Sequence, residues 1–321
     1  MTNDYKPAEQ RTMYFIGVST GKSSIMKVFP AWAEELKLNA VIRGFDFPPN
    51  DDPAHYREVV MFIKHDTNSL GSLVTTHKLN LFKAARDLFD GIDPYTQLLD
   101  EVSSISKRGS ELWGHAKDPI TAGLSLEAIV DDKYWQRTQG HLLLLGAGGS
   151  SLALTLYLHN KLAEGGDVPS RIIVTNRSEM RLNEMKIVHQ KLGFTIPVEY
   201  HMNPSAYQND LLTKNLPPFS MVVNATGLGK DAPGSPLTDR AVFPENGVAW
   251  EFNYRGELIF MEQAKAQEKS RHLKIEDGWV YFVHGWTRVV AEVFHLDIPT
   301  SGPAFDRLSD IAGQFSSGGK K

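Results

Sequence analysis

Short apolar runs alternate with longer amphipathic stretches along the chain. Apolar runs rich in β-branched residues predict strands, and stretches with apolar residues at every third or fourth position predict helices. In the first half the expected strands are 13–19, 40–45, 70–75 and 102–107, and the expected helices are 23–38, 53–65, 78–90 and 120–130. Strands that alternate with helices are typical of an α/β fold.

A polar segment, 131–140, interrupts this alternation, and we expect a domain boundary there. A second series of strands is expected at 142–145, 171–175, 198–200, 221–225 and 248–252. We expect the apolar helix 280–296 and the tail through Phe315 to return to the first domain, and the terminal SSGGKK (316–321) to be disordered. The prediction is a substrate and catalytic domain of residues 1–130 plus 280–321, and a second domain of residues 131–279.

Composition narrows the class of protein. The chain has 321 residues, 41% of them hydrophobic, which suits two globular domains. A net charge of −4 gives no basic field for nucleic acid or anionic lipid. No apolar run approaches the roughly 18 residues of a membrane helix, and the polar start MTNDYKPAEQ lacks the apolar core of a secretory signal. We therefore expect a soluble cytoplasmic protein with no nucleic-acid or membrane partner.

Two residue types argue against a metal centre. The chain has no cysteine, which excludes disulfides, thiolate nucleophiles and cysteine-bound zinc. Its eleven histidines show neither HxH nor HxxxH spacing, so we expect no metal site.

The segment 140–151, GHLLLLGAGGSS, predicts a dinucleotide-binding turn. Four leucines fit a buried parallel strand, and a glycine-rich turn and a helix at 152–162 follow. Such glycines let a pyrophosphate approach the backbone N–H groups at a helix start, although some turns of this type only pack a helix on a sheet. The expected cofactor-binding residues here are Gly146, Ala147, Gly148, Gly149 and Ser150.

The next expected strand, 171–175, indicates which dinucleotide binds. In an NAD site this strand usually ends in an acid that binds the ribose 2′-hydroxyl. Here it ends in Asn176, Arg177 and Ser178, with Arg181 one helical turn further. Guanidinium groups can bind a 2′-phosphate, whereas the alternative is a solvated arginine at a helix start. The prediction is NADP rather than NAD.

Three segments of the second domain resemble the shikimate/quinate dehydrogenase family: GAGGSS (146–151), TNRSEMR (175–181) and VVNATGLG (222–229). The third is similar to the family's NAT-x-x-G loop near the nicotinamide, which implies that Asn224, Ala225, Thr226 and Gly227 bind the cofactor. The resemblance extends from about Met13 to Pro299. It implies an N-terminal α/β substrate domain, a doubly wound Rossmann-type NADP domain, and a monomer or homodimer.

The first domain carries the catalytic part of this resemblance. GSLVTTHK (71–78) resembles the family's G-x-NVT-x-P-x-K with one residue fewer before the lysine, and HAKD (115–118) falls where the family has x-NTD. The resemblance implies that Lys78 and Asp118 are catalytic. A lysine ammonium can stabilise a developing alkoxide and transfer a proton to it, and a carboxylate can orient the ammonium. Without the resemblance, Lys78 would be a surface lysine and Asp118 a helix cap before Pro119.

The expected substrate contacts are less complete. GKSS (21–24) takes the place of the family's SxS loop, and EFNYRGEL (251–258) resembles its D-x-x-Y-x-P-x-x-T segment. The resemblance implies that the substrate-binding residues are Ser23, Thr75, Ser103, Tyr254 and, at the family's glutamine, either His284 or Gly285. Ser23 would otherwise suit a helix start, Thr75 a strand end, and His284 a structural role.

Several family positions are changed in this chain. Gly21 replaces a serine, and Leu73 and Ser103 replace two asparagines. A substrate hydroxyl left without its partner costs about 1–3 kcal/mol. The resemblance therefore implies NADP-dependent interconversion of a secondary alcohol and a ketone on a cyclic polyhydroxy carboxylate, namely shikimate, quinate or a related compound. The alternative is a non-catalytic NADP- or metabolite-binding regulator on the same fold.

Overall fold

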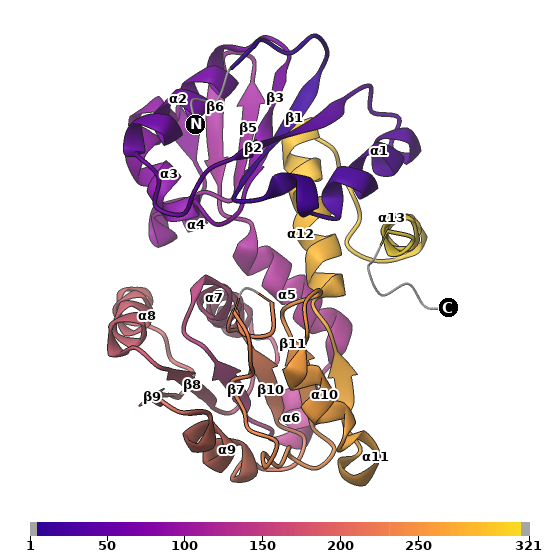
Figure 1. Cartoon of the computed structure of the whole chain (residues 1–321). Coiled ribbons are helices and arrows are strands. Elements are labelled where there is room, and N and C mark those ends of the chain that lie inside the picture. The colour runs from indigo at the N-terminus through magenta and orange to yellow at the C-terminus, as the bar shows by residue number, and fades with distance from the viewer. Residues whose placement is uncertain (1–4, 231, 316–321) are drawn as a thin grey trace. The chain divides into compact units, whose positions relative to one another are not determined.

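The computed structural model describes residues 5–230 and 232–315 (Figure 1). The chain forms two compact units. Unit 1 consists of Met1–Lys117 and Val283–Lys321, and unit 2 is the continuous segment Asp118–Phe282. The expected disorder of residues 316–321 concerns positions outside the described residues. Each unit contains a sheet and flanking helices, which confirms the α/β class.

Unit 1 is built on a mixed sheet whose described strands follow the order β2-β1-β3-β5-β6-β4. The strands are β1 (Thr12–Gly17), β2 (Val41–Asp46), β3 (Ser69–Val74), β4 (Gly91–Ile92), β5 (Ser104–Arg108) and β6 (Glu111–His115). β5 is antiparallel to both of its neighbours, and the other described pairs are parallel. The carboxyl ends of β1, β2, β3 and β6 therefore lie at the same edge as the amino end of β5.

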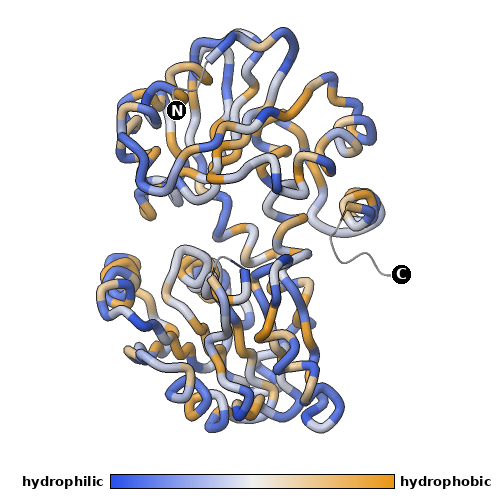
Figure 2. The backbone as a smooth tube through the Cα atoms, viewed as in Figure 1, coloured by the Kyte–Doolittle hydropathy of each residue, from blue (hydrophilic) through white to orange (hydrophobic). Residues whose placement is uncertain are grey.

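The helices of unit 1 follow the amphipathic stretches of the sequence. They are α1 (Ile25–Glu35), α2 (Pro53–His65), α3 (Lys78–Ala85), α4 (Pro94–Leu99), the larger part of α12 (Trp279–Phe294) and α13 (Pro303–Gly313), with short 3-10 turns at Thr20–Lys22 and Arg86–Leu88. Figure 2 shows hydrophobic and hydrophilic positions alternating along the peripheral helices, as expected for helices with one buried side. α13 packs against α1, where the indole N–H of Trp32 donates to the carbonyl oxygen of Leu308 at 2.8 Å.

Unit 2 is built on a parallel sheet of order β12-β11-β10-β7-β8-β9. Its strands are β7 (Leu142–Leu145), β8 (Ile172–Asn176), β9 (Val198–Met202), β10 (Met221–Asn224), β11 (Val248–Glu251) and β12 (Lys274–Glu276). Its helices are α5 (Asp118–Ile129), α6 (Tyr134–Thr138), α7 (Gly149–Ala163), α8 (Glu179–Leu192), α9 (Ala206–Lys214), α10 (Ile259–Lys265) and α11 (Glu268–Arg271). The chain runs outward from β7 to β9 and then returns to β10 on the other side of β7. This order is the doubly wound Rossmann topology, with its switch point between β7 and β10.

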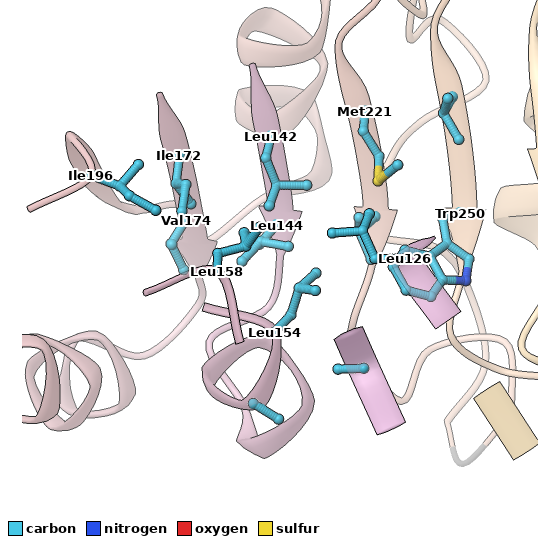
Figure 3. Packing of buried hydrophobic residues seen from close by; sticks show 14 of the residues in the cluster. Leu126, Leu142, Leu144, Leu154, Leu158, Ile172, Val174, Ile196, Met221 and Trp250 are labelled. Atoms are coloured by element: carbon cyan, nitrogen blue, oxygen red, sulfur yellow. The ribbon is translucent and has the colours of Figure 1, made fainter. Parts of the chain in front are cut away.

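The four leucines of β7 are buried because helices cover both faces of this sheet. Leu142 and Leu144 belong to one apolar cluster, which includes Trp250 and is shown in Figure 3. Leu143 and Leu145 belong to a second cluster on the opposite face. A strand buried on both sides reads as a continuous apolar run rather than an alternating one, which explains the sequence of β7.

Helix α5 belongs to unit 2, whereas the sequence places residues 120–130 in the first domain. The helix packs on α7, and its buried Leu126 is part of the core around β7. Gly123 allows this close approach, because a Cβ atom there would overlap the ring of Tyr157. The expected polar boundary at 131–140 also differs from the structure, since it contains α6, whose Trp135 is buried in the same core.

Gly123→Ala is expected to lower the free energy of unfolding by about 1–3 kcal/mol, because the added methyl group forces the Tyr157 ring to move. Urea denaturation followed by far-ultraviolet circular dichroism measures this loss. In a Tyr157→Ala background the same substitution is expected to cost little. An equal loss in both backgrounds would show that the ring does not cause it.

None of the helices within the described residues has the length and apolarity required to span a bilayer.

Candidate functional site

The glycine turn after β7 is tightly packed on one side and open on the other. Gly146 has φ = +112°, and a Cβ atom there would lie 2.8 Å from the carbonyl oxygen of Ala225. At Gly148 and Gly149, by contrast, an added Cβ would meet no atom within 4 Å. Gly148 caps the start of α7, whose first N–H groups have no partner within the helix. This open helix start can accept an anionic group.

The three segments expected to bind the cofactor are brought together at the carboxyl edge of the unit 2 sheet. The N–H of Ala147 donates to Oδ1 of Asn176, at the end of β8, over 3.4 Å. On the other side, Gly146 lies against Ala225 and Thr226, which follow β10. The turn therefore contacts the ends of both neighbouring strands, at the point where open parallel sheets bind ligands.

The two arginines expected near a 2′-phosphate differ in their surroundings. Arg177 is exposed and makes no hydrogen bond or ion pair with any residue that the structure describes. Arg181, in the first turn of α8, forms a half-exposed ion pair with Glu184 at 2.8 Å. Between them, the carbonyl of Ser178 accepts a hydrogen bond from the Asn176 amide at 3.0 Å. Arg177 is thus the guanidinium more readily available to an incoming anion.

A buried acid that the sequence analysis did not single out lies beside the loop after β10. Glu251 ends β11 in register with Asn224, and neither residue is exposed. Its Oε2 accepts from Nδ2 of Asn224 at 2.6 Å. Its Oε1 accepts from the N–H of Asn253 at 2.8 Å and from Nδ2 of Asn253 at 2.7 Å. Burial raises the pKa of Glu251 to about 7, against the lowering effect of these hydrogen bonds.

Tyr254 lies three residues beyond Glu251, in a group of aromatic side chains. Its ring centroid is 4.8 Å from that of Phe282 and 5.8 Å from that of Trp279. The guanidinium of Arg255 lies 6.0 Å from the Tyr254 ring centroid. The phenol is only partly buried, so the ring is fixed by packing while part of it remains accessible.

Lys78, Thr75 and Ser103 are neighbours at one edge of the unit 1 sheet. Lys78 begins α3, and its N–H donates to the carbonyl of Thr75 at 3.2 Å. Ser103 lies beside the end of β3, because its carbonyl accepts from the N–H of Val74 at 2.9 Å. The Thr75 hydroxyl donates to the carbonyl of Ile16, and both Thr75 and Lys78 are partly buried.

Ser23 comes from a separate turn of unit 1. It follows the 3-10 turn after β1, and its N–H donates to the carbonyl of Thr20 at 2.9 Å. Gly17, at the end of β1, lies against Thr20 and Thr75, since a Cβ atom there would be 2.9 Å from Oγ1 of Thr75 and 3.2 Å from Cγ2 of Thr20. The Thr20 turn before Ser23 and the Thr75 turn therefore meet at Gly17, at the carboxyl edge of the sheet.

The Ser103 hydroxyl forms a hydrogen bond within the protein. It accepts a hydrogen bond from the N–H of Lys117 at 2.8 Å, and Ser103 is buried. The ammonium of Lys117 is itself bound to Glu292 at 2.7 Å. These contacts fix the backbone directly before Asp118, the first residue of α5 and of unit 2. Ser103 thus has a structural partner where the sequence predicts a substrate contact.

Two other positions expected near the substrate are buried. His284 stacks on Phe305 with ring centroids 4.4 Å apart, and burial lowers its pKa to about 4. It is therefore a neutral histidine packed in unit 1, next to Gly285. Leu73, near the end of β3, is also buried and offers no hydrogen-bonding group.

No protein-family model matches the chain. Two curated proteins are similar in sequence, both named shikimate dehydrogenase (NADP(+)). The protein from Streptococcus thermophilus is 26% identical over 182 residues, which cover 56% of this chain and 58% of the relative. The protein from Lactococcus lactis subsp. cremoris is 27% identical over 180 residues, which cover 56% of this chain and 59% of the relative. The match thus spans less than two thirds of either relative.

Solved structures with the same fold match nearly the whole chain. A shikimate dehydrogenase in complex with NADP+ has a TM-score of 0.72 at 18% identity, covering 96% of each chain. A quinate dehydrogenase from Corynebacterium glutamicum in complex with NAD has a TM-score of 0.70 at 16% identity, covering 94% of this chain and 98% of that one. A 5-ketofructose reductase from a Gluconobacter strain has a TM-score of 0.68 at 16% identity, covering 94% and 98%. The resemblance to shikimate and quinate dehydrogenases is confirmed, as is the expected two-domain fold.

Proposed function

We propose that this chain is an NADP(H)-dependent oxidoreductase that interconverts a secondary alcohol and a ketone on a cyclic polyhydroxy carboxylate. The observation that carries the proposal is the meeting of the Gly146 turn with Asn176 and with the Ala225–Thr226 segment at the switch point of a doubly wound sheet. The sequence similarity to two NADP(+) shikimate dehydrogenases supports the same cofactor and reaction type.

The residues present suit NADP. The open backbone at Gly148 and Gly149 leads to the start of α7, which fits a pyrophosphate. Arg177 has a guanidinium free to bind a 2′-phosphate, and the loop after Asn224 would face the nicotinamide. When bound, the cofactor supplies or accepts the hydride.

Lys78 and Asp118 are the proposed catalytic residues. In the reduction a hydride adds to the carbonyl carbon, and the oxygen then needs a proton. The Lys78 ammonium can donate this proton and stabilise the charge that develops on the oxygen. Asp118 would accept a hydrogen bond from the alcohol.

The substrate contacts favour a compound related to shikimate over shikimate itself. Leu73 provides no polar group, and the hydroxyl of Ser103 is bonded to the N–H of Lys117. Ser23, Thr75 and Tyr254 remain as proposed contacts. A polar substrate group left without a partner would cost about 1–3 kcal/mol, so a substrate with fewer or differently placed ring hydroxyls fits better.

A spectrophotometric screen tests the proposal. NADP⁺ reduction is followed at the nicotinamide absorbance with shikimate, quinate and related cyclic hydroxy acids, and NADPH oxidation is followed with 5-ketofructose, the sugar named for one structural neighbour. Turnover of a cyclic hydroxy acid supports the proposal, and turnover of the sugar alone would overturn its substrate class. Tight NADPH binding with no hydride transfer to any of these compounds would instead support a non-catalytic NADP-binding regulator, a function that the inward-facing Ser103 and His284 also suit.

Two glycine substitutions in the turn after β7 are expected to act differently. Gly149→Ala should leave thermal stability unchanged, since its Cβ meets no atom within 4 Å, but it should weaken NADPH binding because the methyl group enters the space of the pyrophosphate. Gly146→Ala should lower the thermal midpoint, because it adds a Cβ to a residue at φ = +112° facing a carbonyl oxygen. Differential scanning fluorimetry and NADPH fluorescence titration measure these effects. Unchanged NADPH affinity in Gly149→Ala would contradict the proposed pyrophosphate position.

A further inference from the structure

Glu251 is a buried acid bound only by neutral partners in the hydrogen bonds described. Three donors reach its carboxylate: Nδ2 of Asn224, and the backbone N–H and Nδ2 of Asn253. A carboxylate without any exposure is costly unless its hydrogen bonds are satisfied, so the burial of Glu251 calls for a physical reason. The backbone segment that these partners hold supplies one.

The two asparagines extend from Glu251 to the loop after β10. Oδ1 of Asn224 accepts from the N–H of Thr226 at 3.1 Å and from its hydroxyl at 2.6 Å. The Thr226 hydroxyl oxygen in turn accepts from the N–H of Leu228 at 3.2 Å. Nδ2 of Asn253 reaches the carbonyls of Thr226 and Leu228, both at 3.3 Å. Glu251 is thus connected to the 224–228 loop by two routes, one through Asn224 and one through Asn253.

Each asparagine has its orientation set by the acid. Because Glu251 accepts from Nδ2 of Asn224, the Oδ1 of that side chain is turned toward Thr226. Because Asn253 donates to the same carboxylate, its amide nitrogen also lies beside the loop carbonyls. The conformation of the 224–228 loop therefore depends on the carboxylate of Glu251, which lies at the end of β11 and is not part of the loop. The same loop packs against Gly146 through Ala225 and Thr226.

We infer that Glu251 is a positioning residue that holds the 224–228 loop in the conformation that binds the nicotinamide half of the dinucleotide. The inference rests on the proposed function, since it assigns a role to that loop in cofactor binding. Its consequence is selective: loss of Glu251 weakens the contact with the nicotinamide half and leaves the adenosine half, at Asn176 and Arg177, unaffected.

The carboxylate is the form of Glu251 that binds this network more strongly, because all three groups that contact it are donors. A proton would occupy the lone pair that the three donors leave free, and it would remove the negative charge that strengthens these hydrogen bonds. Burial raises the pKa of Glu251 to about 7, and the charge of Lys230, in the loop after β10, acts against this rise. We therefore expect the loop to loosen as the pH falls below about 7.

The test compares two ligands on the full chain. NADPH carries both halves of the dinucleotide, whereas adenosine 2′,5′-bisphosphate carries the adenosine half with the same 2′-phosphate. In Glu251→Gln the Kd for NADPH at pH 8 is expected to rise about tenfold, equivalent to the loss of one or two hydrogen bonds, while the Kd for the bisphosphate changes less than about twofold. In the wild type the ratio of the two Kd values should depend on pH, with an apparent pKa near 7. Glu251→Gln should remove this pH dependence.

Asp210→Asn is the matched control. Asp210 is also a buried acid of unit 2 that fixes a loop, through hydrogen bonds from the N–H and the hydroxyl of Thr238. It is expected to alter stability without changing the ratio of the two Kd values. Glu251→Asp keeps the charge and should retain part of the pH dependence, which provides a second variant if Glu251→Gln does not fold.

The outcomes separate the two proposals. A wild-type chain that binds neither ligand would overturn the proposed function. Normal binding of both ligands, with the same Kd ratio and pH profile in Glu251→Gln as in the wild type, would overturn the role of Glu251 alone. An equal weakening of both ligands in Glu251→Gln would also overturn it, because it would indicate a general structural effect.

Discussion

Lys78→Ala is expected to lower kcat by about 10²- to 10⁴-fold on the substrate that the screen identifies, the range that a general acid contributes. The ammonium is the group lost, and no other residue is proposed to donate the proton. The start of α3 is expected to remain in place, because the hydrogen bonds of Lys78 with Thr75 and Val102 use its backbone N–H and carbonyl, which alanine keeps. Steady-state kinetics, with NADPH affinity measured separately, give the result.

Lys83→Ala is the control for Lys78→Ala. Lys83 lies in the last turn of the same helix, α3, and is exposed, so its removal changes the charge without reaching the proposed reaction centre. Its kcat should match that of the wild type. Turnover of Lys78→Ala at the wild-type rate would show that the catalytic assignment is wrong, whatever the substrate.

Arg177→Ala is expected to raise the Kd for NADPH by about 10- to 100-fold and to change the Kd for NADH less than about twofold. A charge-assisted hydrogen bond to phosphate contributes about 1.5–3 kcal/mol, and only NADPH carries the 2′-phosphate. We expect the upper part of this range, because Arg177 has no ion pair within the described residues that it would have to break to bind the phosphate. Fluorescence titration with the two dinucleotides measures it.

Arg181→Ala provides the comparison. Arg181 already pairs with Glu184, so binding a phosphate would require it to leave or share that partner. Its substitution should therefore weaken NADPH binding less than Arg177→Ala does. If Arg177→Ala weakens NADPH and NADH equally, the 2′-phosphate contact is not where the sequence pattern predicts it.

Elements with a strong local signal could be predicted closely. The helix expected at 53–65 has those bounds in the structure, because Asp52 caps it and Pro53 fixes its first residue. β6 was missed, since it joins β5 through a tight turn at Gly109 and pairs as a hairpin inside a mostly parallel sheet. α6 was missed because its surrounding sequence is polar, although Trp135 is buried in the unit 2 core.

That the segments expected to bind the cofactor lie together could be predicted, because each ends a parallel strand, and strand ends of a doubly wound sheet converge. The neighbours of the residues expected to bind the substrate could not be predicted. Ser103 is bonded to the N–H of Lys117, fourteen residues away, and such a pairing leaves no pattern in the sequence. Glu251 lies in the quoted segment 251–258 but was given no role, because only the register between β10 and β11 places it beside Asn224.

Unit 1 consists of two chain segments, and this division affects the order in which the protein can fold during translation. The indole of Trp32 finds its acceptor, Leu308, 276 residues later, so the first sheet leaves the ribosome long before α13 can cover α1. Unit 2 is continuous and can be complete while the final helices are still being translated. The segment made first should therefore be the last to finish folding, and its apolar surfaces should depend most on chaperones during translation.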